Sequence, residues 1–223
     1  MIYAKASSMF SLLFKPIRAL SCLLLLASSS ASFGEQQIKI MLFGDSLMAG
    51  YGLTQSESLA SELSNRFDKD GITVRLINAS VSGNTSSNGL ARLDWSLDDN
   101  PDVVVLCLGA NDMLRGIDPT LTKENLSTMI NKIQENGATV VFAGMRSPES
   151  MGEDYQSQFD RLYIDLAQQH GLIFMPFLLE DIALEAKYLQ RDYKHPNALG
   201  IRVVAANLYP YLVKGIAVQQ NTD

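Results

Sequence analysis

The sequence predicts an α/β protein, a three-layer α/β/α sandwich around a five-stranded parallel sheet. Short apolar runs alternate with longer segments in which apolar residues recur at helical spacing. The runs are continuously hydrophobic rather than alternating, which is typical of strands covered on both faces. Glycine follows several of the helical segments, where a residue that tolerates positive φ ends a helix. Strand and helix therefore alternate five times, the order of a parallel sheet with helices on both faces.

Each predicted element has its own signal. The apolar runs are rich in Ile, Val, Leu and Phe, and the fifth is weaker than the others; in chain order they are 38–44, 72–77, 103–108, 139–144 and 172–176. Between them, three helical faces carry apolar residues at Leu59, Leu63 and Phe67, at Leu126, Ile130 and Ile133, and at Phe159, Leu162 and Leu166. The glycines that end these segments are Gly71, Gly137 and Gly171.

The first 31 residues have the composition of a secretory signal peptide. Lys5, Lys15 and Arg18 precede an apolar run over 19–27, and small residues follow as far as Ala31, after which we expect cleavage. The apolar run is short for a bilayer, which needs about 20 residues, so an uncleaved anchor is the less favoured alternative. We therefore expect an exported protein, periplasmic or secreted, without stable membrane insertion once it is processed.

The rest of the chain has the length of one domain, which we place at 38–213, with 214–223 as a C-terminal tail. Without the first 31 residues, 15 Lys and Arg face 24 Asp and Glu, a net charge of −9. An acidic surface argues against nucleic-acid binding. Cys107 is then the one remaining cysteine, so we expect no internal disulfide and interpret it as a core residue of an apolar strand. We expect a monomer.

Polar residues follow the first three predicted strands, and the carboxyl ends of parallel strands meet at one edge of a sheet. Ser46 follows the first strand, and Asp192 and His195 lie three positions apart near the C-terminus. A hydroxyl is a weak nucleophile until a positioned imidazole takes its proton, and a carboxylate holds that imidazole in the useful tautomer. With two histidines in the chain, the candidate base is nearly determined.

Four sequence blocks lie in a fixed order: FGDSL at 43–47, NASVSGNTS at 78–86, GAND at 109–112 and DYKHPN at 192–197. Over about residues 38–213 the chain resembles the SGNH hydrolase family, also called the GDSL esterases and lipases. It is most similar to the bacterial branch of periplasmic acyl-CoA thioesterases that also act as lysophospholipases and arylesterases. The resemblance implies the flavodoxin-like SGNH hydrolase fold.

The resemblance also implies roles for individual residues. Ser46 would be the nucleophile, His195 the general base and then acid, and Asp192 the carboxylate that orients His195. The oxyanion hole would consist of the backbone N–H groups of Ser46 and Gly83 and the side-chain amide of Asn111. These roles are chemically reasonable, because glycine lets its backbone approach a substrate closely and an amide is a neutral hydrogen-bond donor.

Other residues near the blocks have less clear roles. Asp45 and Asp112 compete as the carboxylate of the triad; the spacing before His195 favours Asp192, and we expect the other two to hold their loops. His170 follows a helical segment, so we expect it at a helix C-terminus, outside the site. Tyr193 and Lys194 stand where relatives usually have small or apolar residues.

Substrate contacts are expected from Asp45 and from two loops. The first loop directly follows the GAND block, and by resemblance it covers an acyl chain. The second contains Arg and Pro and is expected to border the acyl pocket. The candidate substrate-binding residues are Asp45, Met113, Leu114, Arg115, Arg146 and Pro148.

Several other kinds of site are disfavoured. No Gly-x-Ser-x-Gly surrounds Ser46, and the GAND block lacks the Lys of a phosphate loop. No cluster has metal-ligand spacing, so we expect neither a metal nor a cofactor. We therefore expect a serine esterase that forms an acyl-enzyme on Ser46 and acts on small acyl esters, thioesters or lysophospholipids. The alternatives are a carbohydrate O-acetyl esterase, with a shallower polar pocket, and a non-catalytic lipid-binding protein.

Overall fold

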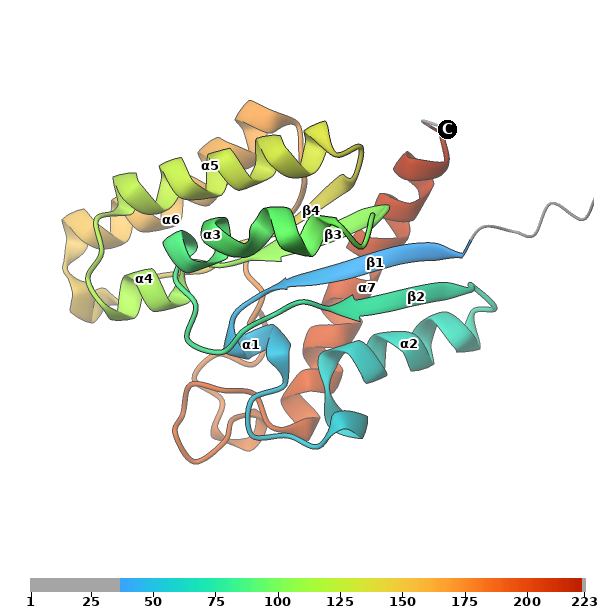
Figure 1. Ribbon diagram of the computed structural model, residues 1–223. Coiled ribbons are helices and arrows are strands. Elements are labelled where there is room, and N and C mark those ends of the chain that lie inside the picture. Colours follow the sequence, from blue (N-terminus) through green and yellow to red (C-terminus); the bar gives the residue numbers. More distant parts are fainter. Residues whose placement is uncertain (1–36, 222–223) are drawn as a thin grey trace, which may run out of the picture. The chain divides into compact units, whose positions relative to one another are not determined.

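The computed structural model describes residues 37–221, so the expected signal peptide, 1–31, lies outside the described residues. Strands of the described chain form one parallel sheet in the order β2-β1-β3-β4-β5 (Figure 1). The strands are β1 (Ile38–Gly44), β2 (Val74–Asn78), β3 (Val103–Cys107), β4 (Thr139–Ala143) and β5 (Ile173–Met175). The predicted three-layer fold with a parallel sheet is confirmed, and each strand lies within two residues of its predicted bounds.

The burial of each strand follows from its place in the sheet. β3 lies between two neighbours, and every one of its residues is buried. β2 lies at an edge and is only partly buried, which explains why polar residues interrupt its run. Cys107 ends β3 and is 1% exposed, in the core as predicted. Burial raises the pKa of its thiol well above the ordinary value, so this sulfur stays protonated and unreactive.

Helices cover both faces of the sheet. α2 (Leu59–Lys69) and α7 (Ala198–Gln220) pack together on one face, while α3 (Ser86–Leu97), α5 (Pro119–Glu135) and α6 (Glu153–His170) cover the other (Figure 1). The predicted apolar faces are buried: Leu59, Leu63 and Phe67 in α2, Leu126, Ile130 and Ile133 in α5, and Phe159, Leu162 and Leu166 in α6. His170 is the last residue of α6, as predicted, and its Nε2 lies 3.0 Å from Oγ of Ser127, away from the cavity described below.

The expected C-terminal tail at 214–223 is wrong for most of its length, because α7 continues to Gln220. Gly215 allows this turn of α7 to approach the sheet: an added Cβ would lie 3.2 Å from a Val103 methyl carbon and 3.1 Å from one of Val141. Ile216 is buried, and Gln219 hydrogen-bonds Thr139 on β4. α7 also has the length and hydropathy of a membrane span, but its buried face packs on β3, β4 and β5, which makes it a core helix of this domain.

The carboxyl ends of the strands carry the short elements. α1 (Ser46–Ala49) follows β1, and α4 (Ala110–Leu114) follows β3. The long segment between β5 and α7 contains the 3-10 turn η3 (Ala186–Tyr188) and returns to the same end of the sheet (Figure 1). Two further 3-10 turns are η1 (Gln55–Glu57) and η2 (Glu149–Met151). Segments far apart in sequence therefore meet at one edge.

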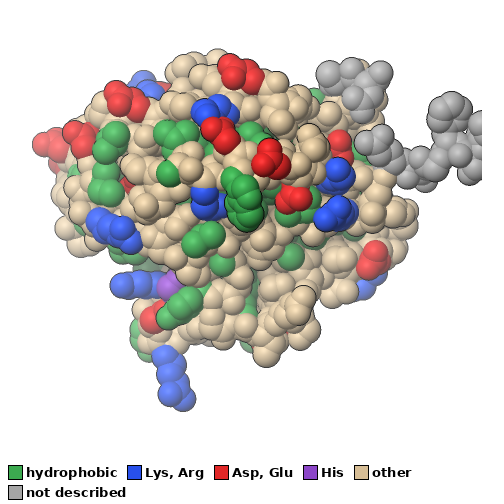
Figure 2. Space-filling view, in the orientation of Figure 1, with side chains coloured by type: hydrophobic (Ala, Val, Ile, Leu, Met, Phe, Trp, Pro, Cys, Tyr) green, Lys and Arg blue, Asp and Glu red, His purple; other side chains and the backbone are tan. Residues whose placement is uncertain are grey.

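The surface mixes charges of both signs. On the face shown in Figure 2, acidic and basic side chains are interspersed and hydrophobic side chains form small separate groups. Trp95 on α3 is 79% exposed and stands apart from the larger apolar surface around the cavity described next.

Candidate active site

Ser46, His195 and Asp192 form a hydrogen-bonded chain at the carboxyl edge of the sheet. Oγ of Ser46 lies 2.8 Å from Nε2 of His195, although 149 positions separate the two residues. Nδ1 of His195 lies 2.6 Å from Oδ2 of Asp192. This geometry lets the imidazole take a proton from the hydroxyl while the carboxylate holds the Nδ1–H tautomer. The structure thus brings together the three residues expected to form the triad.

Asp192 is held ready as an anion. Its Oδ2 pairs with His195, and its Oδ1 accepts the backbone N–H groups of Lys194 at 3.0 Å and His195 at 3.1 Å. The pKa of Asp192 is held well below its ordinary value, mainly by the hydrogen bond from the His195 ring and to a smaller extent by these two backbone hydrogen bonds. The same bonds make a tight turn, in which Tyr193 takes a φ of 57°. Tyr193 and Lys194, which stand where relatives usually have small or apolar residues, therefore lie inside the turn that joins Asp192 to His195.

Ser46 is presented by a strand-to-helix transition. Asp45 is the N-cap of α1, and its Oδ1 accepts the backbone N–H of Leu47 at 3.0 Å. Ser46 is the first residue of α1, where a backbone N–H has no partner inside the helix. Within residues 37–221 this N–H has no hydrogen-bond acceptor. It is therefore available to a substrate oxygen.

Gly83 offers a second such N–H from the loop between β2 and α3. Its φ is 81°, a conformation that costs an L side chain about 1–2 kcal/mol, and an added Cβ would meet no atom within 4 Å. The described part of the chain holds no acceptor for the Gly83 N–H either. Two unpaired donors thus line the cavity that contains the Ser46 hydroxyl.

Asn111 differs from the expectation in one respect. Its amide nitrogen donates to Oδ2 of Asp45 at 3.1 Å and to the carbonyl oxygen of Asn84 at 3.0 Å. Both amide hydrogens are therefore committed inside the protein. Asn111 lines the cavity, but in this state it links the β1 end to the β2–α3 loop, and it must exchange one of these bonds to reach an oxyanion.

Asp45 and Asp112 hold loops, as predicted. Asp45 is 1% exposed, and its hydrogen bonds go to Leu47 and Asn111. Its burial raises the pKa to about 6, although the hydrogen bond from Leu47 opposes this rise. Asp112 is fully buried and accepts the N–H of Ser86 at 2.8 Å and its hydroxyl at 2.5 Å.

Two arginines brace the loop that carries Gly83. Nη2 of Arg115 donates to the Gly83 carbonyl at 2.9 Å, so Arg115 supports this loop and does not line the cavity, contrary to expectation. Arg92 on α3 donates to the carbonyls of Gly44 at 3.1 Å and Ala79 at 2.5 Å, and to Oδ1 of Asn84 at 2.6 Å. Arg92 therefore ties together the ends of β1 and β2. The sequence analysis missed it because its partners are distant in sequence.

The His195 segment has its own support. Gln190 donates from Nε2 to the carbonyls of Tyr51 at 2.7 Å and Pro196 at 2.9 Å, and its backbone N–H donates to the carbonyl of His195 at 2.8 Å. The Tyr51 ring packs on the His195 ring with a centroid distance of 4.5 Å. Sequence reasoning also missed Gln190 and Tyr51, since neither belongs to a recognisable motif. Both limit the freedom of the imidazole.

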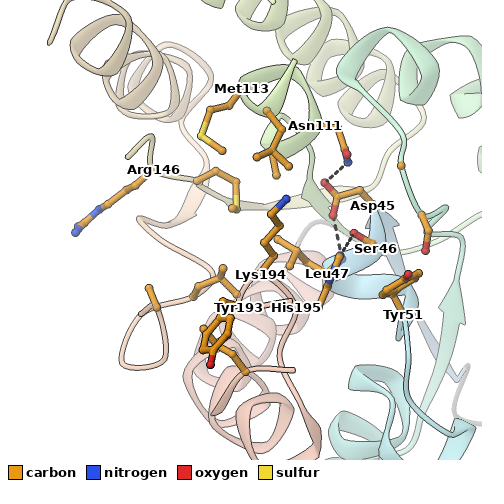
Figure 3. Close-up of a pocket in the computed structure, with 18 of the residues that line it drawn as sticks. Asp45, Ser46, Leu47, Tyr51, Asn111, Met113, Arg146, Tyr193, Lys194 and His195 are labelled. Atoms are coloured by element: carbon orange, nitrogen blue, oxygen red, sulfur yellow. Dashed lines mark hydrogen bonds between the residues drawn. The ribbon is translucent and has the colours of Figure 1, made fainter. Parts of the chain in front are cut away.

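A cavity of about 380 Å³ adjoins the Ser46 hydroxyl. Figure 3 shows the side chains that surround it, with Ser46 and His195 on one side and Met113 and Arg146 on the other. Its walls are largely apolar, formed by Leu47, Met113, Leu114, Met145, Phe177, Leu179, Ala183, Leu184 and Leu189. Pro148 precedes η2 and is not among the residues that line the cavity, so its expected contact with substrate stays a prediction. The segment 177–189, which had no sequence motif, supplies one whole wall.

The described residues hold no group of three or more His, Cys, Asp or Glu side chains placed to bind a metal ion. The site consists of a hydroxyl, an oriented imidazole, two open N–H donors and an apolar cavity. Such a set can form and break an acyl bond on oxygen with protein groups alone.

Comparison with known proteins places this geometry in context. The model of the GDSL-like Lipase/Acylhydrolase family matches residues 42–203. An arylesterase of Vibrio mimicus is 40% identical over 182 residues, which cover 81% of this chain and 90% of the relative. The thioesterase 1/protease 1/lysophospholipase L1 of Escherichia coli (strain K12) is 33% identical over 159 residues, 71% of this chain and 75% of the relative. The crystal structure of the psychrotrophic esterase EstA from Pseudoalteromonas sp., inhibited by monoethylphosphonate, has a TM-score of 0.76 at 32% identity and covers 80% of this chain and 98% of its own.

Proposed function

Because the chain belongs to the GDSL-like lipase/acylhydrolase family, we propose that it hydrolyses acyl esters and thioesters through an acyl-enzyme on Ser46. The observation that carries the assignment of residues is the 2.8 Å contact between Oγ of Ser46 and Nε2 of His195, beside an apolar cavity. Membership of an esterase family supports an enzyme and leaves the alternative of a non-catalytic lipid-binding protein without support.

Acylation begins when the Ser46 oxygen attacks the substrate carbonyl carbon. Nε2 of His195 accepts the hydroxyl proton, and Asp192 stabilises the imidazolium that forms. The carbonyl oxygen becomes an oxyanion, which the N–H groups of Ser46 and Gly83 are placed to accept. His195 then donates its proton to the departing alcohol or thiol, the carbon–oxygen or carbon–sulfur bond breaks, and the acyl group stays on Ser46.

Deacylation repeats the sequence with water. His195 takes a proton from a water molecule, whose oxygen attacks the acyl-enzyme carbonyl, and the same N–H donors stabilise the second oxyanion. The proton returns to Oγ of Ser46 as the acid leaves. Asn111 would take part if an oxyanion displaces one of its two internal acceptors.

The cavity supports an acyl group with an apolar part. A wall built from several Leu and Met side chains favours a hydrocarbon chain over a hydrated sugar. This disfavours a carbohydrate O-acetyl esterase, which needs a shallow polar pocket. We infer that aryl esters, lysophospholipids and acyl thioesters are the substrate classes to test, since the names of the relatives mention all three.

Labelling with a fluorophosphonate probe tests the assignment of Ser46. The purified protein should be labelled and should hydrolyse 4-nitrophenyl pentanoate. Ser46→Ala should abolish both, whereas Ser56→Ala, which removes an exposed hydroxyl on η1, should leave both intact. Labelling that survives in Ser46→Ala would overturn the assignment of the nucleophile.

We also infer that the protein is exported, loses residues 1–31 and acts as a monomer. The basic residues, apolar run and small residues at its start support the first inference. Mass spectrometry of the protein recovered from the periplasm or medium should give an N-terminus at Ser32. Light scattering should give the mass of one processed chain. Recovery of the intact N-terminus, or of a dimer mass, would contradict these inferences.

A further inference from the structure

Among the described residues that line the cavity, one cationic side chain has neither an ion-pair partner nor a hydrogen-bond acceptor. Four strongly ionisable side chains line it: Asp45, Arg146, Lys194 and His195. Asp45 and His195 are engaged as described above. Arg146 lies over the Phe177 ring at 5.2 Å, with Nη2 4.0 Å from a Glu180 oxygen. Among residues 37–221, the ammonium group of Lys194 has no hydrogen-bond acceptor and no carboxylate partner.

The position of Lys194 is set by the triad itself. Its backbone N–H donates to Oδ1 of Asp192 at 3.0 Å, and the next residue is His195. The backbone of Lys194 is therefore fixed relative to the Ser46 hydroxyl. Figure 3 shows its side chain extending into the cavity, with the ammonium end on the side of Met113.

The surroundings of this ammonium group are mostly apolar. Leu47, Met113 and Met145 line the same cavity, and Asp45, the one carboxylate among the lining residues of the described chain, is buried and already bonded to Leu47 and Asn111. Lys194 is itself exposed to solvent, so this attraction depends on the substrate: an acyl chain that fills the cavity excludes water from the inner side of the ammonium group, and a cation there attracts an anion more strongly than it does at an open surface. The acyl group of a substrate extends into this space when its carbonyl carbon lies at Ser46.

We propose that Lys194 selects esters and thioesters whose acyl part carries a carboxylate, such as half-esters of short dicarboxylic acids. This inference rests on the proposed function and adds a substrate class to it. The carboxylate of the acyl chain would pair with the ammonium group of Lys194, while the methylene groups contact Leu47, Met113 and Met145. No atom of Lys194 takes part in bond breaking, so it acts as a specificity residue.

A matched pair of substrates tests this. The kcat/KM for 4-nitrophenyl hydrogen glutarate is divided by that for 4-nitrophenyl pentanoate, which has the same acyl length without the charge. Uncatalysed rates are subtracted, because the neighbouring carboxylate speeds spontaneous hydrolysis. A second pair, 1-hexanoylglycerol 3-phosphate and 1-hexanoylglycerol, places the charge on the leaving group instead.

The variants are Lys194→Met, Lys194→Arg and, as a matched control, Lys187→Met. Lys187 lies on η3 in the same segment but does not line the cavity. In Lys194→Met the glutarate ratio should fall about tenfold, the size of a partly exposed charge-assisted hydrogen bond. Lys194→Arg should keep most of the preference, Lys187→Met should keep all of it, and raised salt should weaken it in the wild type.

Equal ratios in the wild type and Lys194→Met would overturn the proposal. A Lys194-dependent preference confined to the glycerol phosphate pair would overturn the placement of the charge on the acyl part. Fluorophosphonate labelling of Ser46 in every variant shows that the site is folded. If the wild type hydrolyses neither the glutarate nor the pentanoate, the proposed function fails as well; if it hydrolyses both without Lys194-dependent selection, this inference alone fails.

Discussion

Asn111 donates an amide hydrogen to the carboxylate of Asp45, 3.1 Å away, from within the cavity that holds Ser46. The carboxylate is almost fully buried, and it also caps the helix that Ser46 begins. A single buried acid thus positions both the nucleophile and the third expected oxyanion donor. Its protonation state therefore affects stability and geometry together.

Replacing Asp45 with Asn should change how stability depends on pH. Burial raises the pKa of Asp45 from its ordinary value near 4 to about 6. An acid whose pKa is raised in the folded protein contributes stability that is fully present below pH 4 and is lost as the pH rises through 6. Asn does not titrate, so the variant does not lose this stability as the pH rises. The free energy of unfolding of Asp45→Asn, relative to that of the wild type, should therefore be roughly 2–3 kcal/mol higher at pH 7.5 than at pH 4. Urea denaturation at several pH values measures this, and a pH-independent difference would contradict it.

Asp192→Asn should remove most of the activity while preserving the fold. The Asn oxygen still accepts the N–H groups of Lys194 and His195, but the neutral amide no longer favours the Nδ1–H tautomer or stabilises the imidazolium. The kcat for 4-nitrophenyl pentanoate should fall on the order of 10³- to 10⁴-fold. Asp98→Asn, at the exposed end of α3, serves as the control and should leave kcat unchanged. A loss below tenfold in Asp192→Asn would contradict the role of this carboxylate.

Arg92→Met should reduce kcat more than it changes KM. The guanidinium holds Gly44, Ala79 and Asn84, and its loss leaves the loop that carries Gly83 less well positioned. We expect a decrease in kcat of about 10- to 100-fold and a loss of about 1–3 kcal/mol in the free energy of unfolding. Stopped assays and urea denaturation measure the two. Arg75→Met, on the exposed side of β2, should change neither, and an equal effect of both variants would rule out a specific role for Arg92.

Gly83→Ala and Gly137→Ala separate strain from catalysis. Both glycines have positive φ, 81° and 89°, and neither has an atom within 4 Å of an added Cβ. Each substitution should therefore cost about 1–2 kcal/mol of stability. Only Gly83→Ala should lower kcat, by about 100-fold, because the strained backbone moves its N–H away from the oxyanion. Similar kcat values in the two variants would exclude the Gly83 N–H as a donor.

Leu184→Ser should affect long acyl chains selectively. Leu184 lines the cavity although it is 96% exposed, and its φ is 67°. A long acyl chain that covers this side chain gains apolar contact at about 25 cal/mol per Å². We expect KM for 4-nitrophenyl decanoate to rise several-fold and KM for the acetate to stay the same. A parallel rise for both esters would show that Leu184 does not contact the acyl chain.

The sequence predicted those parts of the protein that depend on local patterns. Continuous apolar runs located the strands, and the helical faces were identified because their spacing reports burial directly. Ser46, Asp192 and His195 could be named because the chemistry restricts the residue types. The wall at 177–189 could not, since an irregular segment has no periodicity and its role depends on where the chain returns.

Polar contacts between residues far apart in the chain could not be predicted from the sequence either. Arg92 reaches a carbonyl 48 positions away, and Gln190 one that is 139 positions away. An Arg on an amphipathic helix or a Gln in a loop is usually solvated, so neither residue type suggests a bracing role. Arg115 was expected to contact substrate because it lies in the loop that follows the GAND block. Its long side chain instead donates to the Gly83 carbonyl. The end of α7 was missed because the sequence alone does not show that Gly215 lets this turn of the helix approach the sheet.

The turn that joins Asp192 to His195 means that acid and base are held to each other by bonds within four residues, while their link to Ser46 spans the chain. A displacement of the turn would move Asp192 and His195 together and keep the bond between them, but it would break the bond between His195 and Ser46. The segment 177–189 that precedes the turn is anchored in the core by Leu178 and Ile182, which are both fully buried. The alignment of the imidazole with the nucleophile therefore depends on the same core packing that holds the sheet.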